Sequence, residues 1–376
     1  MPPILYRDIP QIPESAYAAE MEAILTELEA TTKASYGKEK QQRAVRSAHA
    51  KSYGIVRASF EIPTGLAGEY AQGIYATPAT YEVVIRFSNG LGHLGPDAAL
   101  GPIFGMGLKL FGVPGHSVLE NEAEVSNFDY AMINGPVFFA NTAKDYVVIQ
   151  RLFDALPGAL RDPRTAKAWL HDFLTREGTL SPENWLWDEV FALMSLVKTP
   201  WWNPLLATYW TMGAVRHGNY VAKLRAAPEA SAAARVTRRD LNPLTGLEAV
   251  RDSLVAEIGE HDYRFDLEAQ LCVDPLRMPI ENTSIEWSEK LSPFMKIATI
   301  HIPKQDISPA VNLEIADRTS ITPWRTRESH VPLGEIMTAR REVYRRSAKL
   351  RREINQQPQR EPSCANEVFA QPQPVH

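Results

Sequence analysis

The sequence has little cysteine and no long apolar run. Its 376 residues include two cysteines, Cys272 and Cys364, which are too few and too badly placed for a disulfide framework. No uninterrupted apolar stretch reaches the length of about 18 residues that a membrane-spanning helix needs. The start, MPPILYRDIPQIP, lacks the apolar core of a signal peptide. These absences predict a cytoplasmic protein without a transmembrane segment.

Charge excess and the common nucleotide or metal motifs are also missing. A formal net charge of -5 gives no reason to expect a nucleic-acid partner. The GMG at 105–107 lacks the third glycine and the strand–turn–helix setting of a dinucleotide site, and no Walker loop, HExxH or CxxC occurs. His261 lies beside acidic residues, where a solvated loop is the simpler interpretation than a metal site.

The chain does contain many strand-like segments around a helical block. Residues 14–33 have helical periodicity, and residues 150–215 read as helices broken by prolines. A basic helix is expected over about 335–354, followed by a Pro/Gln-rich tail, 356–376, that we expect to be disordered. Apolar and β-branched runs predict strands at 54–62, 81–88, 104–113, 129–139, 219–227, 263–274 and 295–303. This organisation favours one large β-barrel rather than a doubly wound sheet.

The first of these strands begins in an unusual way. Arg46 and His49 stand three residues apart just before it, and on a regular strand they would point to opposite faces. Both can reach one partner only if the chain enters the strand irregularly.

Five segments resemble the catalase family in order and rough spacing. They are RSAHAKSYG at 46–54, IRFSNG at 85–90, INGPVFF at 133–139, LEAQLCVDPLRMPIENTSIEW at 267–287 and SHVPLG at 329–334. The resemblance implies an α+β fold, with a catalase-like antiparallel β-barrel at about 45–355, an N-terminal helical arm at 1–44 and surrounding helices that include the insertion at 150–215. It also implies haem as the cofactor and a peroxide as the small-molecule substrate.

The resemblance assigns roles to individual residues. His49 matches the distal histidine, which moves a proton between the two peroxide oxygens, and Ser88 matches the serine that orients it. Asn134 falls next to the position of a catalytic asparagine, where a normal turn residue is an equal interpretation. Arg46 and Arg86 match arginines that pair with haem propionates. Phe138 and Tyr146 match pocket rings, although a core role alone would explain both.

The iron ligand is the point at which the chain departs from the family pattern. Catalases hold iron through a tyrosine that follows an arginine by four residues and precedes the segment matched at 329–334. Residues 317–334, DRTSITPWRTRESHVPLG, contain no tyrosine, and the next one, Tyr344, lies inside the basic helix, which reads as a solvated face. Cys272 could offer a thiolate, but a buried inert thiol is the simpler interpretation. The metal ligand is therefore left unassigned.

Tryptophans gather between residues 185 and 210. Five of the chain's 8 lie there, namely Trp185, Trp187, Trp201, Trp202 and Trp210. A helical cover over the barrel is the simpler interpretation, and an apolar channel or a weak membrane-surface contact is the alternative.

Two functions remain open from the sequence. The first is a haem-dependent oxidoreductase that acts on hydrogen peroxide or an organic hydroperoxide, with a role in oxidative stress. The second is a haem-free catalase-fold protein used for small-molecule binding or structure. A homo-oligomer is compatible with either.

Overall fold

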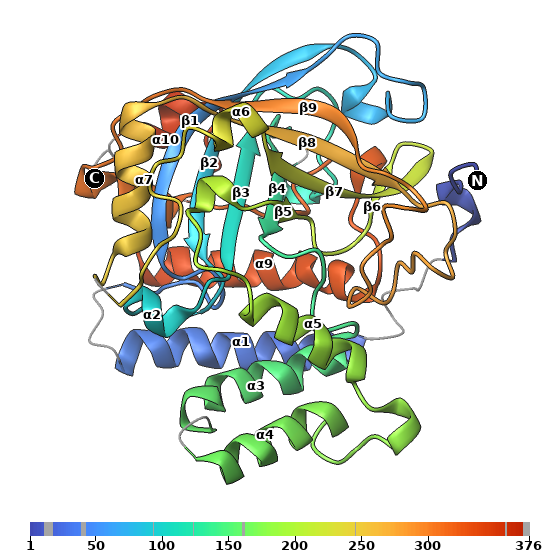
Figure 1. Ribbon diagram of the computed structural model, residues 1–376, viewed down its shortest axis with the longest axis vertical. Coiled ribbons are helices and arrows are strands. Elements are labelled where there is room, and N and C mark those ends of the chain that lie inside the picture. Colours follow the sequence, from blue (N-terminus) through green and yellow to red (C-terminus); the bar gives the residue numbers. More distant parts are fainter. Residues whose placement is uncertain are drawn as a thin grey trace.

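A closed antiparallel barrel forms the centre of the protein (Figure 1). The computed structural model describes residues 1–10, 18–38, 43–92, 94–122, 124–159, 162–244, 246–357 and 359–370. Its sheet has the order β5-β4-β3-β2-β1-β9-β8-β7-β6, and an additional pairing of β5 with β7 closes the ring and leaves β6 outside it. The strands are β1 Ser52–Ile62, β2 Ala79–Asn89, β3 Phe104–Leu110, β4 Phe128–Ile133, β5 Tyr209–Trp210, β6 Val215–His217, β7 Tyr220–Pro228, β8 Tyr263–Leu271 and β9 Met295–Ile302.

Alternation of apolar and polar residues explains why these segments form a barrel. In β8, Phe265, Leu267 and Ala269 are fully buried, whereas Arg264 between two inward positions is exposed. The predicted α+β fold with an antiparallel barrel is confirmed. Each predicted strand is present, and β1 enters the barrel irregularly, because its pairing with β2 shifts register between Ser52 and Gly54.

Helices cover the barrel in layers at one end. The long helix α9 crosses that end, α1 lies beyond it, and α3 and α4 follow outside (Figure 1). The described helices are α1 Ala18–Lys38, α2 Asp97–Leu100, α3 Ala143–Ala159, α4 Pro163–Thr175, α5 Trp187–Val197, α6 Ala230–Ala233, α7 Ala249–Glu260, α8 Ala310–Arg318, α9 Glu335–Ile354 and α10 Ala365–Phe369. The helical block predicted over 150–215 corresponds to α3 to α5, which begin earlier, at Ala143, and end at Val197; the predicted range also contains β5 and the first residue of β6. The first positions of the helix predicted over 14–33 lie outside the described residues.

The C-terminal tail is held by buried charges, so the prediction of disorder over 356–376 is wrong for 356–357 and 359–370. Glu361 lies 3.0 Å from the Lys109 ammonium group, 3.1 Å from the Arg325 guanidinium group and 2.5 Å from that of Arg352. Apolar side chains of α10 pack beside this network. Composition could not reveal these partners, because they are distant in sequence.

We call the network of buried charges the paired cluster: Lys109, Glu122, Asp129, Arg325, Arg352 and Glu361. Pro358 and residues 371–376 lie outside the described residues.

Within the described ranges, no helix combines the length and the apolar character that a membrane span requires.

Candidate functional site

A cavity of about 1050 Å³ separates the barrel from the helices at its covered end. Strands β2, β3 and β4 contribute one wall, α9 contributes the opposite wall, and α1, α3 and α5 close the sides. Sites for drug-sized ligands usually measure about 300 to 1,000 Å³, so this cavity can hold a large cofactor and a small molecule beside it.

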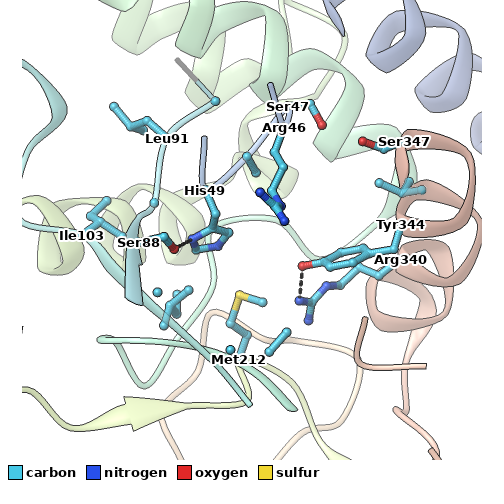
Figure 2. Close-up of a pocket in the computed structure, with 18 of the residues that line it drawn as sticks. Arg46, Ser47, His49, Ser88, Leu91, Ile103, Met212, Arg340, Tyr344 and Ser347 are labelled. Carbon is cyan, nitrogen blue, oxygen red and sulfur yellow. Dashed lines mark hydrogen bonds between the residues drawn. The ribbon is translucent and has the colours of Figure 1, made fainter. Parts of the chain in front are cut away.

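His49 projects into the cavity from the segment that leads into β1 (Figure 2). Its backbone has a φ of 56°, in the left-handed region that few residues other than glycine adopt. The carbonyl of His49 accepts a hydrogen bond of 2.8 Å from Arg86 Nη2, which holds this conformation. Space for the ring comes from Gly105 on β3, where an added Cβ would lie only 2.4 Å from His49 Nδ1.

The neighbours of the imidazole fix which nitrogen is free. His49 Nδ1 lies 2.6 Å from the carbonyl oxygen of Asn89 and 3.2 Å from Ser88 Oγ. A carbonyl oxygen can only accept, so we assign the proton to Nδ1, and Nε2 keeps its lone pair. Burial and, to a lesser extent, the nearby positive charge of Arg86 together lower the pKa of His49 to about 4. At neutral pH the ring is therefore uncharged and can accept a proton at Nε2.

A tyrosine and an arginine face this histidine from α9 (Figure 2). Tyr344 and Arg340 are four residues apart, so they lie on the same face of the helix, and both line the cavity. Arg340 Nη2 donates a hydrogen bond of 2.8 Å to the Tyr344 hydroxyl oxygen. The basic face of α9 is thus not simply solvated, because Arg340, Arg351 and Arg352 are buried.

Three further arginines, which we call the cavity arginines, line the same space: Arg46, Arg86 and Arg351. Arg46 donates to the carbonyl oxygen of Thr319 at 2.5 Å, and Arg86 donates to Ser52 Oγ at 2.7 Å. The Nε atom of Arg351 is buried without a hydrogen-bond partner.

The cavity arginines have no carboxylate partner among the described residues. The carboxylate of Asp317, which is near them, is bound by Arg43 and by Ser52 Oγ instead. Burial, together with the positive charges of the other arginines, lowers the pKa of each of the three, and those of Arg86 and Arg351 fall well below the ordinary value. This part of the cavity is therefore suited to a ligand with negative charges.

Aromatic rings line the cavity at the α3 side. The ring centroids of Phe138 and Phe139 are 4.4 Å apart, and those of Phe138 and Tyr146 are 6.4 Å apart.

Asn134 does not line the cavity. Its Nδ2 donates to the carbonyl oxygen of Pro102 at 2.9 Å, and its Oδ1 accepts from the backbone N–H of Phe104 at 2.7 Å. The carboxamide therefore stabilises a loop, which favours the turn interpretation over the catalytic one.

The structure brings together most, but not all, of the residues suggested by the sequence. The ones that line the cavity are Arg46, His49, Arg86, Ser88, Phe138 and Tyr146. Cys272 is buried elsewhere, with its thiol directed at the carbonyl oxygen of Met278, and burial raises its pKa to about 11. None of the five clustered tryptophans is among the lining residues.

Solved structures resemble this arrangement of barrel and helices. Neither a family model nor a curated protein sequence matches the chain. A fungal catalase superposes with a TM-score of 0.59, catalase A from Saccharomyces cerevisiae with 0.57 and a bacterial catalase with 0.56, each at 15% identity. The fold is catalase-like. The matches cover 83, 84 and 85% of this chain but only 60, 63 and 59% of those catalases.

The residues of this catalase-like cavity fit haem. A tetrapyrrole with two carboxylates would give the cavity arginines the negative charges that they lack, including a partner for the orphaned Nε of Arg351. Iron accepts a tyrosine oxygen as a ligand, and Tyr344 presents one opposite His49. Within the described ranges, no group of three or more His, Cys, Asp or Glu side chains could hold a metal ion by itself.

Sequence reasoning missed Tyr344, Arg340 and Arg351. The match of 329–334 to the segment that follows the ligand in catalases predicts a tyrosine before residue 329, whereas the tyrosine that lines the cavity is Tyr344. The sequence does contain the arginine–tyrosine spacing of the family, in ARREVY at 339–344. Arg351 follows Tyr344 by seven residues, which is two helical turns and the same face.

Proposed function

We propose that this protein is a haem-dependent oxidoreductase that cleaves a peroxide, with His49 as the acid–base residue and Tyr344 as the iron ligand. The observation that carries the proposal is the opposition of two groups across one cavity: a neutral imidazole with a free Nε2, and a tyrosine oxygen held by a guanidinium group. Its support is that both groups line one cavity at the covered end of a catalase-like barrel.

The chain's own residues supply the proton transfers and the binding of the cofactor. Haem, when bound, supplies the redox chemistry of the iron. His49 Nε2 takes the proton of one peroxide oxygen and delivers it to the other, which leaves as the O–O bond breaks. The carbonyl of Asn89 and Ser88 Oγ hold the ring in the tautomer that this step needs. The cavity arginines would hold the propionates of bound haem, and Phe138 would pack against its ring system.

Absorption spectra and peroxide consumption of three proteins test the proposal. We expect wild-type protein from haem-supplemented cells to show a Soret band and to consume peroxide. His49→Ala should keep the Soret band and lose the activity, because Nε2 acts on oxygen and not on iron. Tyr344→Phe should lose haem or change its spectrum. Loss of haem in His49→Ala would instead make His49 a ligand, and unchanged turnover would exclude it as the acid–base residue.

A Soret band that is absent even in the wild-type protein would favour the haem-free alternative, in which the cavity binds another anionic small molecule.

Both cysteines are free thiols, which agrees with a protein of a reducing compartment such as the cytoplasm.

A further inference from the structure

The side of the cavity formed by β3, β4 and α5 is lined by glycine and apolar residues. Ser88, Gly105 and Ile133 are directly paired across strands β2, β3 and β4. Residues paired in this way point to the same face of the sheet. The side chain of Ile133 therefore lies in the same row as Ser88, two strands away, or about 10 Å. In this row the side chain nearest to the asparagine is thus that of Ile133, because Asn134 is one residue later and does not line the cavity.

Ile133 belongs to a small apolar cluster with Leu196 of α5 and Met212, all buried and all lining the cavity. Ile103, Phe138 and Phe139 pack against it. Met212 has a φ of 65°, an uncommon conformation for a residue with a side chain, and its thioether points into the cavity (Figure 2). A methionine can adapt its shape to different apolar partners.

The cluster continues to the surface along α5. Val197 lines the cavity beside Leu196, yet its side chain is 52% exposed. It therefore forms an edge between the cavity and solvent. Trp187, Phe191 and Met194 lie on the outer face of the same helix, with exposed fractions of 49, 62 and 42%, but do not line the cavity.

We propose that the substrate is an alkyl hydroperoxide whose O–O group lies at His49 and whose alkyl chain lies against Ile133, Leu196 and Met212 and leaves past Val197. This inference rests on the proposed function. Hydrogen peroxide has polar groups at both ends, and this wall offers it few partners, whereas each buried CH₂ of an alkyl chain should improve binding roughly fourfold. A phenol is the co-substrate by class: ROOH takes two electrons from phenol molecules and two protons, the O–O bond breaks, and ROH and water form.

Chain length is the direct test of the proposed wall. We expect kcat/KM, measured with guaiacol as the phenol, to rise roughly fourfold per CH₂ from ethyl to hexyl hydroperoxide and to exceed the value for hydrogen peroxide. Ile133→Asn should lower the ratio of the hexyl value to the hydrogen peroxide value at least tenfold. Val197→Glu should reduce kcat/KM for hexyl much more than for ethyl hydroperoxide. The control Phe191→Glu lies on the same helix but outside the cavity, and should change neither.

Binding of the product alcohols provides a readout that does not need turnover. Isothermal titration calorimetry with 1-butanol and 1-hexanol should give a lower Kd for 1-hexanol, with a negative heat-capacity change. Ile133→Asn should weaken the binding of 1-hexanol.

The outcomes separate this inference from the proposed function. A kcat/KM that is independent of chain length, or an equal loss for ethyl and hexyl hydroperoxide in Val197→Glu, would overturn the alkyl site while peroxide cleavage by His49 still stands. Absence of any His49-dependent peroxide cleavage would remove the proposed function and this inference with it.

Discussion

Two groups of buried arginines show what carboxylate partners do inside this protein. In the paired cluster, Arg325 contacts the carboxylates of Glu122, Asp129 and Glu361. Among the cavity arginines, Arg86 and Arg351 make no ion pair with any carboxylate of the described residues. The two groups are equally remote from solvent, since Arg325, Arg86 and Arg351 are all buried.

The pKa of Arg325 and those of the cavity arginines shift in opposite directions. The carboxylates raise the pKa of Arg325, although burial opposes this, and the surrounding cations lower the pKa of Glu361. Burial and mutual repulsion lower the pKa of Arg86 and Arg351. The paired cluster is therefore complete within the chain, whereas the cavity arginines are complete only with an added anion. Buried cations without partners thus mark a binding site, and buried cations with partners mark a structural one.

The largest expected effect comes from removing a cation of the paired cluster. Arg325→Met leaves three carboxylates near each other with only Lys109 and Arg352 to neutralise them. We expect the free energy of unfolding of the haem-free protein to fall by about 3 to 5 kcal/mol. Urea denaturation followed by circular dichroism measures it. The matched variant Arg351→Met removes an unpaired cation and should leave the stability unchanged or raised; an equal loss in both variants would contradict the comparison.

The same pair of groups should differ in ligand binding. Arg351→Met removes a charge-assisted hydrogen bond of about 1.5 to 3 kcal/mol to a propionate, so haem affinity should fall roughly 10- to 150-fold. Titration of the haem-free protein, followed at the Soret band, gives the affinity. Arg345, exposed on α9 and paired with Glu342, provides the control, because Arg345→Met should leave haem affinity unchanged.

Acidification should weaken the paired cluster through Glu361. Its folded-state pKa lies below the unfolded value of about 4.3, so the unfolded chain takes up the proton first. The stabilisation by this carboxylate is complete above the unfolded pKa and is lost as the pH falls through the folded pKa. Glu361→Gln should therefore destabilise the protein by about 1 to 3 kcal/mol at pH 7 and by clearly less below pH 4. A difference independent of pH would mean that the charge of Glu361 is irrelevant.

The smallest expected effect is on the activity at mildly acidic pH. With a pKa of about 4, His49 remains neutral down to about pH 5, so kcat/KM for peroxide should be nearly flat from pH 7 to pH 5 and fall near pH 4. A histidine with the ordinary pKa of about 6.5 would lose most of its activity over that range. Stopped-flow measurements across these pH values distinguish the two, and a midpoint near 6.5 would show that Arg86 and burial do not act on His49 as inferred.

Local patterns in the sequence predicted the fold better than the site. Alternation identified β8, and helix periodicity predicted α9 at 335–354, the range that the structure shows. These signals are contained in short segments. The partners of Glu361 and the role of Tyr344 depend on contacts between distant segments, so neither could be derived from periodicity. The spacing of Arg340 and Tyr344 is visible in the sequence, but the match at 329–334 predicts the tyrosine earlier in the chain.

The cavity is built from both halves of the chain, and this has a consequence for how the protein is made. Ile24 and Ala30 of α1 line it, and Ile24 packs with Val343 of α9. Arg346 of α9 also forms an ion pair of 3.1 Å with Glu22. During synthesis, α1 leaves the ribosome long before its partner helix exists. The cavity therefore cannot close around a ligand until translation has passed α9, so any ligand must enter after most of the polypeptide has been made.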